Sequence, residues 1–369
     1  MSYPFTRFWL NGRFVAISDV IDGHERGRTV FEESALTFIR EWLTDTQTFL
    51  QQTSGSTGAP KTISITRQQM EHSAKLTEQS LELQPFSHSL ICIDTRYIGG
   101  KMMIARSLVT KMAMWIIDPS PYPLQYLPVD QCVNFAAFVP YQVQSMLGSK
   151  HPHLINNVDT MIIGGAALHD EFVDKLKQYQ CQCYAAYGMT ESISHVALRT
   201  LNGQNASSLF TTLPGVEVAA DDRECLVVNA PYLTEHLITN DIVEVHNNRQ
   251  FEWLGRWDNV INTGGYKVLP ERLEAAIQTL FNRAGIGNRF FIYGVADRKL
   301  GHKVALVIEA TGNHVRLIHD TLPSLKGKIN PYEMPKEMLI SPAFRLTDTG
   351  KINRAQTLKS VTQEVSLKK

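Results

Sequence analysis

Short apolar runs alternate with longer amphipathic segments between about residue 60 and about residue 245. This alternation predicts an α/β fold with a largely parallel sheet, because neighbouring parallel strands need helical crossovers between them. The strands are expected at residues 90–94, 115–118, 134–139, 160–163 and 181–186. The helices are expected at residues 67–83, 101–110, 141–147 and 170–178.

The pattern then changes to short strands joined by turns, which is typical of a small β-rich subdomain. We expect a domain boundary near residues 255–258, and therefore domains 1–255 and 256–369. These later strands are expected at residues 216–220, 225–229, 242–246 and 249–253.

The second domain begins with a helix signal. Pro270 suits the first turn of a helix, and Glu271 and Glu274 suit the positive end of its dipole. The polar tail after Leu358 is expected to be loose. Further strands are expected at residues 290–295 and 303–309, and a further helix at residues 315–325.

Composition narrows the classes of partner. The chain has 369 residues, and Lys+Arg and Asp+Glu number 36 each, so no net charge attracts nucleic acid or anionic lipid. The most apolar stretches, residues 112–117 and 133–139, are too short to cross a bilayer, and no stable membrane insertion is expected. The first residues do not resemble a signal peptide.

The five cysteines have no regular spacing and do not suggest a disulfide framework. Cys181 and Cys183 are better interpreted as buried thiols on a strand than as a redox or zinc pair. A reducing, cytoplasmic location is the expectation.

One polar loop has the composition of a phosphate site. Its glycines allow backbone N–H groups to turn toward an anion, its hydroxyls donate hydrogen bonds, and its lysine adds charge. Ala59 and Pro60 separate the second glycine from the lysine, so this is not the P-loop of nucleotide kinases. A polar surface turn is the alternative interpretation. The loop reads Thr53, Ser54, Gly55, Ser56, Thr57, Gly58, Ala59, Pro60, Lys61.

This loop resembles the TSGSTGxPK signature of adenylate-forming enzymes, a family that includes acyl-CoA synthetases, peptide-synthetase adenylation domains and luciferases. Four further motifs of that family follow in its order, and together the five span residues 53–354. They are Tyr187-Gly188-Met189-Thr190-Glu191, Asn240-Asp241, the segment from Gly255-Arg256-Trp257-Asp258 to Pro270-Glu271, and Thr349-Gly350-Lys351-Ile352-Asn353-Arg354.

The resemblance implies a two-step reaction, in which a carboxylate attacks the α-phosphate of ATP and a thiol then takes the acyl group. It also implies a role for each motif residue. The loop would hold the β- and γ-phosphates through Thr53, Ser54, Gly55, Ser56, Thr57, Gly58 and Lys61, and Thr190 the α-phosphate. Glu191 would bind Mg²⁺. Adenine would lie between Gly164-Gly165-Ala166 and Tyr187-Gly188, and the ribose against Asp241 and Arg256. Lys351 would bridge carboxylate and phosphate. Taken singly, Glu191 is better interpreted as a helix-start carboxylate, Asp241 as a turn residue and Lys351 as a solvated loop cation. The five motifs taken together reverse this preference.

The resemblance also implies a mobile, small α+β C-terminal domain. Asp258 would be its hinge, and one orientation would present Lys351 for adenylation. The other would bring a glycine turn to the pantetheine arm of CoA; for this turn a simple β-turn is the alternative. The turn contains Gly264, Gly265, Tyr266 and Lys267.

The chain departs from the family at its start. The phosphate loop begins at residue 53, much earlier than in most members, so much of the N-terminal subdomain is expected to be missing or reduced. The expected fold is therefore an N-terminally shortened adenylate-forming enzyme. Dimerisation could cover the apolar surface that this subdomain would otherwise cover.

The acid is suggested by a separate pattern. Tyr97, Gly100 and Arg106 have the spacing seen in o-succinylbenzoate–CoA ligases of menaquinone biosynthesis. That substrate is a dicarboxylate, and Arg106 would bind its second carboxylate. Arg96 and Lys101 compete for this role, and Arg106 could instead lie on the solvent face of its helix. His195 either faces the pocket or is a packed helix histidine.

Three functions remain open at this point. The first is a CoA ligase that uses ATP, Mg²⁺ and CoA on o-succinylbenzoate or on another small or aromatic acid. The second is a stand-alone adenylation enzyme that delivers to a carrier protein. The third is a non-catalytic nucleotide-binding protein, against which the joint presence of Glu191, Asp241, Arg256 and Lys351 argues.

Overall fold

The chain divides into two compact units. Part of the β-rich segment belongs to the first unit and part to the second. The first contains Met1–Ala219, Val227–Leu237 and Val245–Phe251, and the second contains Ala220–Leu226, Ile238–Glu244 and Glu252–Lys369. The expected domains 1–255 and 256–369 stay a prediction. The computed structural model describes residues 3–52, 61–128, 131–166, 168, 170–310, 314–346, 352–361 and 363–367.

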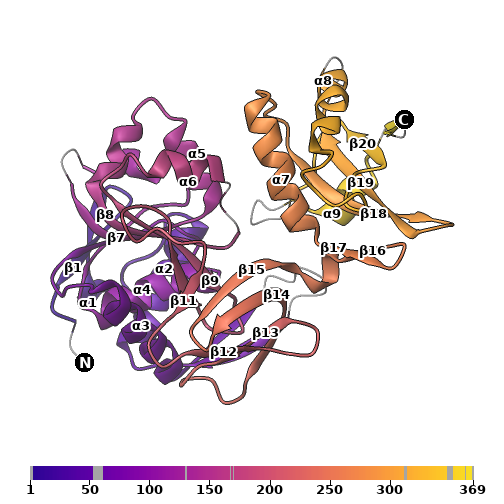
Figure 1. Cartoon of the computed structure of the whole chain (residues 1–369). Helices are drawn as coiled ribbons and strands as arrows, with labels where there is room; N and C mark the ends of the chain where they lie inside the picture. The colour runs from indigo at the N-terminus through magenta and orange to yellow at the C-terminus, as the bar shows by residue number, and fades with distance from the viewer. Residues whose placement is uncertain are drawn as a thin grey trace. The chain divides into compact units, whose positions relative to one another are not determined.

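A mixed sheet forms the centre of the first unit, and helices lie on both of its sides, α3 and α4 on one and α5 and α6 on the other (Figure 1). Its strand order is β11-β10-β9-β8-β7-β5-β6-β1-β2. The strands from β9 to β1 run parallel, and β10, β11 and β2 are antiparallel to their neighbours. The strands are β1 (Arg7–Leu10), β2 (Arg13–Ala16), β5 (His88–Ile91), β6 (Ala113–Ile116), β7 (Val133–Phe138), β8 (Val158–Ile163), β9 (Gln182–Gly188), β10 (His195–Thr200) and β11 (Phe210–Thr212).

The helices begin where the sequence provides a start signal. Thr66 caps α3 and forms a reciprocal pair of hydrogen bonds with Gln69, and Pro140 occupies the first turn of α5. The apolar faces of α5 and α6 pack on the sheet through Val143, Met146 and Leu176. The helices are α1 (Ile17–Ile21), α2 (Val30–Leu43), α3 (Arg67–Leu81), α4 (Ile98–Val109), α5 (Pro140–Leu147) and α6 (Asp170–Leu176).

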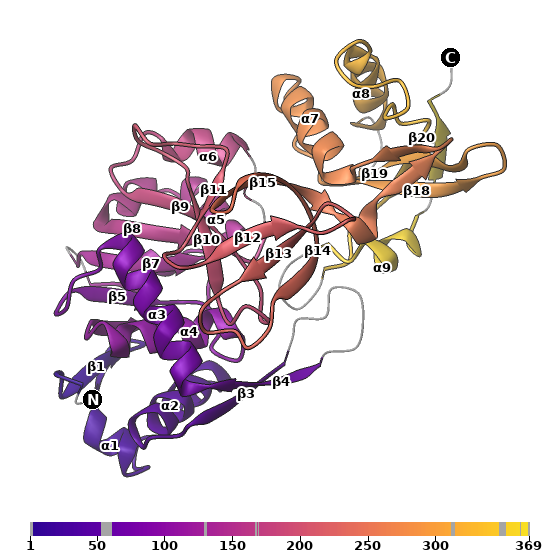
Figure 2. The same ribbon diagram turned by 60° about the horizontal axis from the view of Figure 1, so that its bottom comes forward.

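A separate antiparallel pair, β3 (Thr48–Gln52) and β4 (Thr62–Thr66), lies side by side in Figure 2. Gln52 pairs with Thr62, so the predicted phosphate loop begins and ends beside this pair of strands. The strands of the β-rich segment follow in the order β12-β13-β14-β15, and the division between the two units runs through them. They are β12 (Glu217–Ala220), β13 (Cys225–Asn229), β14 (Leu237–Asn247) and β15 (Gln250–Arg256).

The second unit is an α+β structure with its own core, in which α7 and α8 lie together against a sheet (Figure 1). Ile277 and Phe281 of α7 pack on Val304, Leu306 and Ile308 of β19. The sheet has the order β17-β16-β19-β20-β21, and β18 also pairs with β19. The elements are β16 (Ile261–Thr263), β17 (Tyr266–Val268), α7 (Pro270–Arg283), β18 (Phe290–Asp297), β19 (Gly301–Glu309), α8 (His314–Thr321), β20 (Glu337–Ser341), α9 (Arg354–Leu358) and β21 (Gln363–Ser366).

The predicted fold class is confirmed, and one local expectation is wrong. The tail after Leu358 is not simply loose, because β21 pairs antiparallel with β20, with Val365 opposite Met338. Its pairing partner lies more than twenty residues earlier in the sequence, so local polarity could not reveal the strand.

The cysteines follow the sequence expectation. Cys181 and Cys183 are buried beside β8, and Cys92 and Cys225 are buried too, whereas Cys132 is exposed. All five thiols are free.

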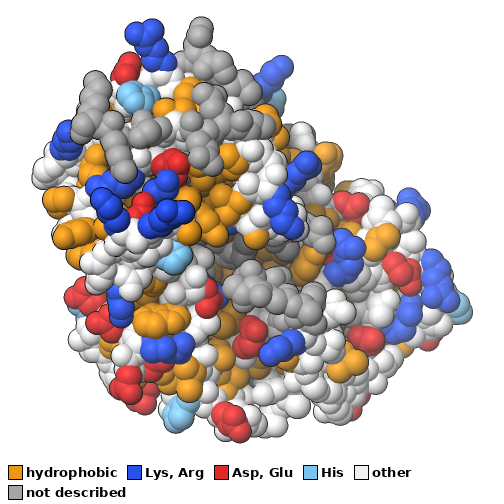
Figure 3. All heavy atoms as spheres, turned by 90° about the vertical axis from the view of Figure 1, so that its right-hand side faces the viewer, with side chains coloured by type: hydrophobic (Ala, Val, Ile, Leu, Met, Phe, Trp, Pro, Cys, Tyr) orange, Lys and Arg blue, Asp and Glu red, His pale blue; other side chains and the backbone are white. Residues whose placement is uncertain are grey.

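On the face drawn in Figure 3, basic and acidic side chains are interspersed, in keeping with equal totals of the two charges. Among the described residues, no helix combines the length and apolar character that a membrane crossing requires.

Candidate active site

Arg106 lies in the last turn of α4 and is buried, with 2% of its surface exposed. Its Nε donates a hydrogen bond to Oγ1 of Thr77 on α3, at 3.1 Å. Its Nη2 donates to Oγ of Ser194 and lies 3.3 Å from Nδ1 of His195. The alternative that Arg106 occupies the solvent face of its helix is therefore wrong.

The charge of Arg106 is not balanced by a protein carboxylate in the described part of the chain, where none of the ion pairs involves this residue. Burial lowers its pKa to about 10, a change that the nearby Tyr232 opposes. Burying a guanidinium without an anion is costly, so this position calls for a negative ligand.

Gly100 explains how α4 comes to lie in this place. A Cβ added at Gly100 would lie 2.5 Å from the carbonyl oxygen of Asp94, so only glycine allows the first turn to approach the end of the preceding strand. Tyr97 is the residue before the helix, in its N-cap position. The helix then carries Arg106 into the interior.

The two competing cations have other partners. Arg96 is 59% exposed, and its Nη2 lies 2.6 Å from Oδ2 of Asp94. Lys101 donates from Nζ to the carbonyl oxygen of Leu50, at 3.3 Å, and burial lowers its pKa while Glu41 opposes this change. Of these three candidates, Arg106 is the fully buried one, and no carboxylate in the described part of the chain pairs with it.

His195 lies at the start of strand β10, so the alternative of a packed helix histidine is wrong. Its residue surface is 5% exposed. Burial and the neighbouring Arg106 hold the pKa of its imidazole well below the usual range, so the ring is neutral at physiological pH. Its Nε2 lies 3.1 Å from Oγ1 of Thr77.

The turn between β9 and β10 carries Thr190 and Glu191. Ser192 organises it, because its Oγ accepts a hydrogen bond from the N–H of Met189 at 2.9 Å. Thr190 is buried and Glu191 is exposed. A Cβ at Gly188 would overlap the carbonyl oxygen of Ser194, so the motif glycine permits the tight return of the chain. Glu191 thus offers its carboxylate to solvent, where a hard cation such as Mg²⁺ could bind.

Tyr187 lies on β9, next to this turn. Its ring contacts Phe210 and Phe251 edge-on, with centroids 5.8 and 5.2 Å apart, so the two phenylalanines orient it. The Gly164-Gly165-Ala166 segment leaves the end of β8, and Gly165 has a left-handed φ of 88°. This backbone conformation suits glycine.

In the second unit, the structure brings two predicted ribose ligands together. Asp241 lies on β14, not in a turn, and is 5% exposed. Its Oδ1 accepts a hydrogen bond from Nε1 of Trp253 at 3.2 Å and lies 3.5 Å from Nη1 of Arg256. Nη2 of Arg256 reaches Oδ2 of Asp258, the predicted hinge residue, at 2.8 Å.

The glycine turn predicted to meet CoA joins β16 to β17. Gly264 and Gly265 have left-handed φ angles of 60° and 84°. Tyr266 stacks on Tyr332, with ring centroids 5.5 Å apart, and Nζ of Lys267 lies 5.0 Å from the ring of Trp257.

Two groups of predicted residues fall outside the described part of the chain. Lys351 is one, and the predictions for it stay untested. In the phosphate loop only Lys61 is described; it is exposed and directly precedes β4. The undescribed members are Thr53, Ser54, Gly55, Ser56, Thr57, Gly58, Ala59 and Pro60.

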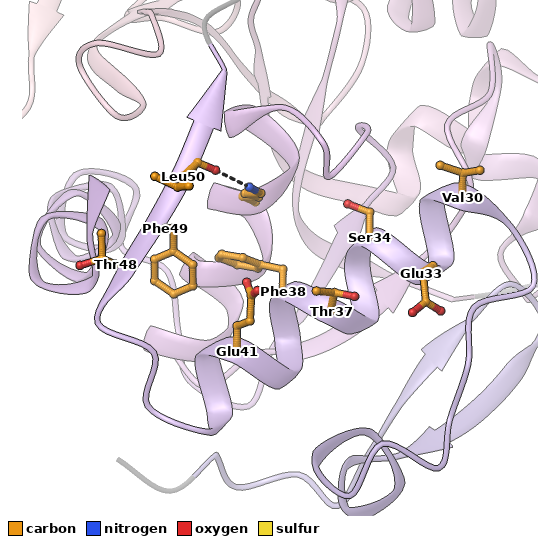
Figure 4. Close-up of a pocket in the computed structure, with 10 residues that line it drawn as sticks. Val30, Glu33, Ser34, Thr37, Phe38, Glu41, Thr48, Phe49 and Leu50 are labelled. Atoms are coloured by element: carbon orange, nitrogen blue, oxygen red, sulfur yellow. Dashed lines mark hydrogen bonds between the residues drawn. The ribbon is translucent and has the colours of Figure 1, made fainter. Parts of the chain in front are cut away.

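A cavity of about 600 Å³ lies between α2, β3 and Lys101 of α4 (Figure 4). The rings of Phe38 and Phe49 lie next to each other there, tilted by 54° with centroids 5.2 Å apart, and the dashed line joins Lys101 to Leu50. The sequence did not indicate this cavity. Of the residues considered for the site its lining contains only Lys101, the competitor of Arg106, so we base the function on the chemistry around Arg106 and not on cavity size. Its lining is Val30, Glu33, Ser34, Thr37, Phe38, Glu41, Thr48, Phe49, Leu50 and Lys101.

The sequence also failed to indicate three partners of the predicted acid site. Thr77 and Ser194 bond to Arg106, and Tyr232, whose pKa burial raises to about 12, lies close enough to influence its charge. Thr77 lies 118 residues from His195 in the sequence, and nothing in its local helical pattern distinguishes it from a core residue.

Comparison with known proteins gives the family. Residues 23–230 match the model of the AMP-binding enzyme family. The 2-succinylbenzoate–CoA ligase of Escherichia coli is 27% identical over an alignment of 329 residues, and the match covers 84% of this chain and 68% of that protein. The ligase of the same name from Salmonella typhimurium is 24% identical and covers 83% of this chain and 69% of its own length.

Solved structures agree. An acyl-CoA synthetase (AMP-forming)/AMP-acid ligase II-like protein from Dyadobacter fermentans is 35% identical, with a TM-score of 0.61, covering 92% of this chain and 97% of that one. The o-succinylbenzoate CoA synthetase of Bacillus subtilis, solved with its acyl-adenylate intermediate, has a TM-score of 0.69 at 18% identity, covering 85% of this chain and 69% of that one. The chain therefore belongs to the AMP-binding enzyme family, as one of its acyl-CoA ligases.

Proposed function

We propose that this protein activates o-succinylbenzoate with ATP and transfers the acyl group to CoA, a reaction of menaquinone biosynthesis. The observation that carries the proposal is the buried Arg106, which has no carboxylate partner among the described residues. A dicarboxylic acid would supply that partner with one carboxylate and present the other to ATP. The planar guanidinium suits a carboxylate better than a lysine would.

The relatives support this acid without deciding it. Two of them are named 2-succinylbenzoate–CoA ligases, but a further relative, from Arabidopsis thaliana, is named a malonate–CoA ligase and is 22% identical. Malonate is also a dicarboxylate, so Arg106 alone does not separate the two acids. The apolar, aromatic part of o-succinylbenzoate would have to make that distinction.

In the first half-reaction, the chain's task is to bring two anions together, so positioning and charge neutralisation dominate. The phosphate loop with Lys61 and the α-phosphate contact at Thr190 would hold the triphosphate. Glu191 would hold Mg²⁺, which supplies positive charge to the phosphates. Asp241 and Arg256 would bind the ribose hydroxyls, and Lys351 would stabilise the charge that shifts from carboxylate to phosphate.

In the second half-reaction, the C-terminal domain would rotate about Asp258. This rotation would move Lys351 away from the acyl-adenylate and bring the turn at Gly264 and Gly265 toward it. Those glycines carry no side chains that obstruct a narrow pantetheine arm. The thiol of CoA then attacks the acyl carbonyl and AMP leaves. We propose a cytoplasmic enzyme with small-molecule substrates and no nucleic-acid partner, which forms a homodimer.

The test is to incubate the protein with Mg-ATP, CoA and a panel of acids, and to follow thioesters by mass spectrometry. We expect o-succinylbenzoyl-CoA to exceed the products of malonate, benzoate, acetate and fatty acids. A preference for malonate would keep the ligase and change its acid. Acyl-adenylate without thioester would indicate a carrier-protein acceptor, and no product at all would favour a non-catalytic nucleotide-binding protein.

A variant pair tests the role of Arg106. Replacing a buried charge by an apolar side chain of similar length is often tolerated, so Arg106→Met should fold. We expect it to lower kcat/KM for the diacid by about a hundredfold, a typical cost of losing one partner of a buried charge pair. Arg96→Met, the exposed competitor, should change kcat/KM by less than about threefold. Equal effects of the two variants would contradict the assignment.

A further inference from the structure

Arg106 is held by groups from three parts of the first unit. Thr77 reaches it from α3, Ser194 from the turn before β10, and His195 from β10 itself. These contacts occupy Nε and Nη2 of the guanidinium. The remaining nitrogen, Nη1, contacts Sδ of Met103 at 3.8 Å among the described residues, and a thioether is a weak acceptor.

The directions of these hydrogen bonds follow from which groups can accept. An arginine only donates, so Nδ1 of His195 accepts from Nη2 of Arg106 and carries no proton. The proton of the neutral ring is therefore on Nε2, which donates to Oγ1 of Thr77 at 3.1 Å. This hydroxyl accepts a second bond, from Nε of Arg106, and donates its own proton to the carbonyl oxygen of Ser73 at 3.2 Å. Both lone pairs and the proton of Thr77 are then used.

Few charged groups face the hydrogen-bonded group of Arg106, His195 and Thr77. Arg106 is the cation beside His195, Tyr232 lies close to Arg106, and the ring of His72 packs on Tyr232 with centroids 5.6 Å apart. Within the described ranges no ion pair includes His195 or Arg106. Protonating His195 would place a second cation 3.3 Å from the guanidinium, in a buried site without a counter-ion, and would remove the lone pair that Arg106 uses.

We infer that His195 and Thr77 are positioning residues for Arg106, and that they leave Nη1 as the edge of the guanidinium presented to the second carboxylate of the acid. The inference rests on the proposed function as far as the acid is concerned. The orientation of the guanidinium and the tautomer of His195 do not depend on it. His195 is thus an acceptor of fixed tautomer and takes no part in proton transfer.

Two replacements of His195 separate its two ring nitrogens. The amide oxygen of asparagine can occupy the place of Nδ1, so His195→Asn keeps an acceptor for Arg106. The amide of glutamine reaches the place of Nε2, so His195→Gln keeps a partner for Thr77 but not the acceptor. We expect His195→Gln to raise KM for o-succinylbenzoate by about tenfold with a smaller effect on kcat, and His195→Asn to raise KM by less than about threefold.

A monocarboxylate, 4-oxo-4-phenylbutanoate, is the substrate control. It cannot engage Nη1 with a second carboxylate, so the difference in KM between the two variants should shrink with it. A purely structural role for His195 would affect both acids alike and would overturn the inference. Thr77→Val and Thr77→Ser form a second pair, in which serine should restore the KM that valine raises.

The tautomer can be observed without any substrate. We would label the protein with ring-¹⁵N histidine and assign His195 by the resonance that disappears in His195→Asn. The resonances should show an unprotonated Nδ1 and a protonated Nε2 from about pH 5.5 to about pH 8. A proton on Nδ1, or titration in this range, would overturn the inference. If no diacid is turned over, the proposed function has failed, and the spectrum alone then decides the inference.

Discussion

Nη2 of Arg354 lies 2.9 and 3.0 Å from the two carboxylate oxygens of Glu274, although 80 residues separate them in the sequence. Glu274 also accepts a hydrogen bond from the N–H of Ile292, at 2.7 Å. Nη1 of Arg354 donates a hydrogen bond to the carbonyl oxygen of Ile292. The guanidinium lies over the ring of Phe291. The start of α9 is thereby tied to α7 and β18, and the last motif of the family is anchored through its arginine.

This anchor should depend on pH. Burial raises the pKa of Glu274 to about 7, even though Arg354 opposes the change. The folded protein therefore holds this proton more tightly than the unfolded chain, and the contribution to stability is fully present below about pH 4.5 and lost as the pH rises through about 7. Relative to the wild type, Glu274→Gln should gain roughly 1–3 kcal/mol in free energy of unfolding between pH 4.5 and pH 8. Urea unfolding across this range measures it.

A constant difference between the two proteins over the whole range would mean that Glu274 keeps an ordinary carboxyl pKa. Glu235→Gln, at an exposed position, is the control and should follow the wild type throughout.

Glu32 should show the opposite dependence. Burial alone would raise the pKa of its carboxyl, but hydrogen bonds from Arg13, the backbone of Arg28 and Asn11 lower it to about 2. Its contribution is therefore present above about pH 4.5 and lost as the pH falls through about 2. Glu32→Gln should cost about 2–4 kcal/mol at pH 7, where it leaves Arg13 poorly paired, and less at pH 2. Urea unfolding at the two pH values compares them, and a larger cost at pH 2 would be contrary to this account.

Adjacent glycines at the start of α4 provide a matched pair. A Cβ at Gly100 would meet backbone atoms of Ile93 and Asp94, whereas a Cβ at Gly99 would make an ordinary contact with the side chain of Ile93. Gly100→Ala should therefore destabilise the protein by about 2–4 kcal/mol and raise KM for the acid, because α4 carries Arg106. Gly99→Ala should be neutral or stabilising by up to about 1 kcal/mol. Thermal unfolding of both variants is the measurement, and similar melting temperatures would refute the explanation.

Lys351→Ala tests the predicted lysine of the reaction. We expect formation of acyl-adenylate to fall by about a hundredfold or more, since a positioned cation that neutralises the shifting charge is lost. ATP binding, measured by calorimetry, should remain within about threefold, because the loop and the ribose contacts are intact. Thioester formation from chemically prepared acyl-adenylate should also persist. Unchanged adenylation would remove Lys351 from the mechanism.

The sequence predicted the elements whose patterns are local. The strands and helices of the parallel sheet lie within a few residues of their expected places, and the spacing of Arg106 to Tyr97 and Gly100 singled it out as the predicted acid ligand. Of the two interpretations of His195, the packed helix histidine is wrong, although its spacing of four residues from Glu191 is that of one helical turn. The left-handed φ of 67° at Ile193 ends that possibility, and the pairing of β10 with β9 determines the strand.

The remaining features depend on contacts between distant parts of the sequence. Thr77 became a site residue only when α3 was placed against α4 and β10, and β21 became a strand only through β20. Burial of Arg106 has the same origin, since the sequence allowed it equally on the solvent face. Propensity and periodicity do not carry this information.

The distribution of thiols has a practical consequence for the predicted hinge. Because four cysteines are buried and Cys132 is exposed, a maleimide dye should attach to the folded chain at one native position. A second thiol introduced at the exposed Lys328 of the other unit would complete a donor–acceptor pair. Single-molecule energy transfer could then follow the two units through adenylation and thioester formation, without first having to remove native cysteines.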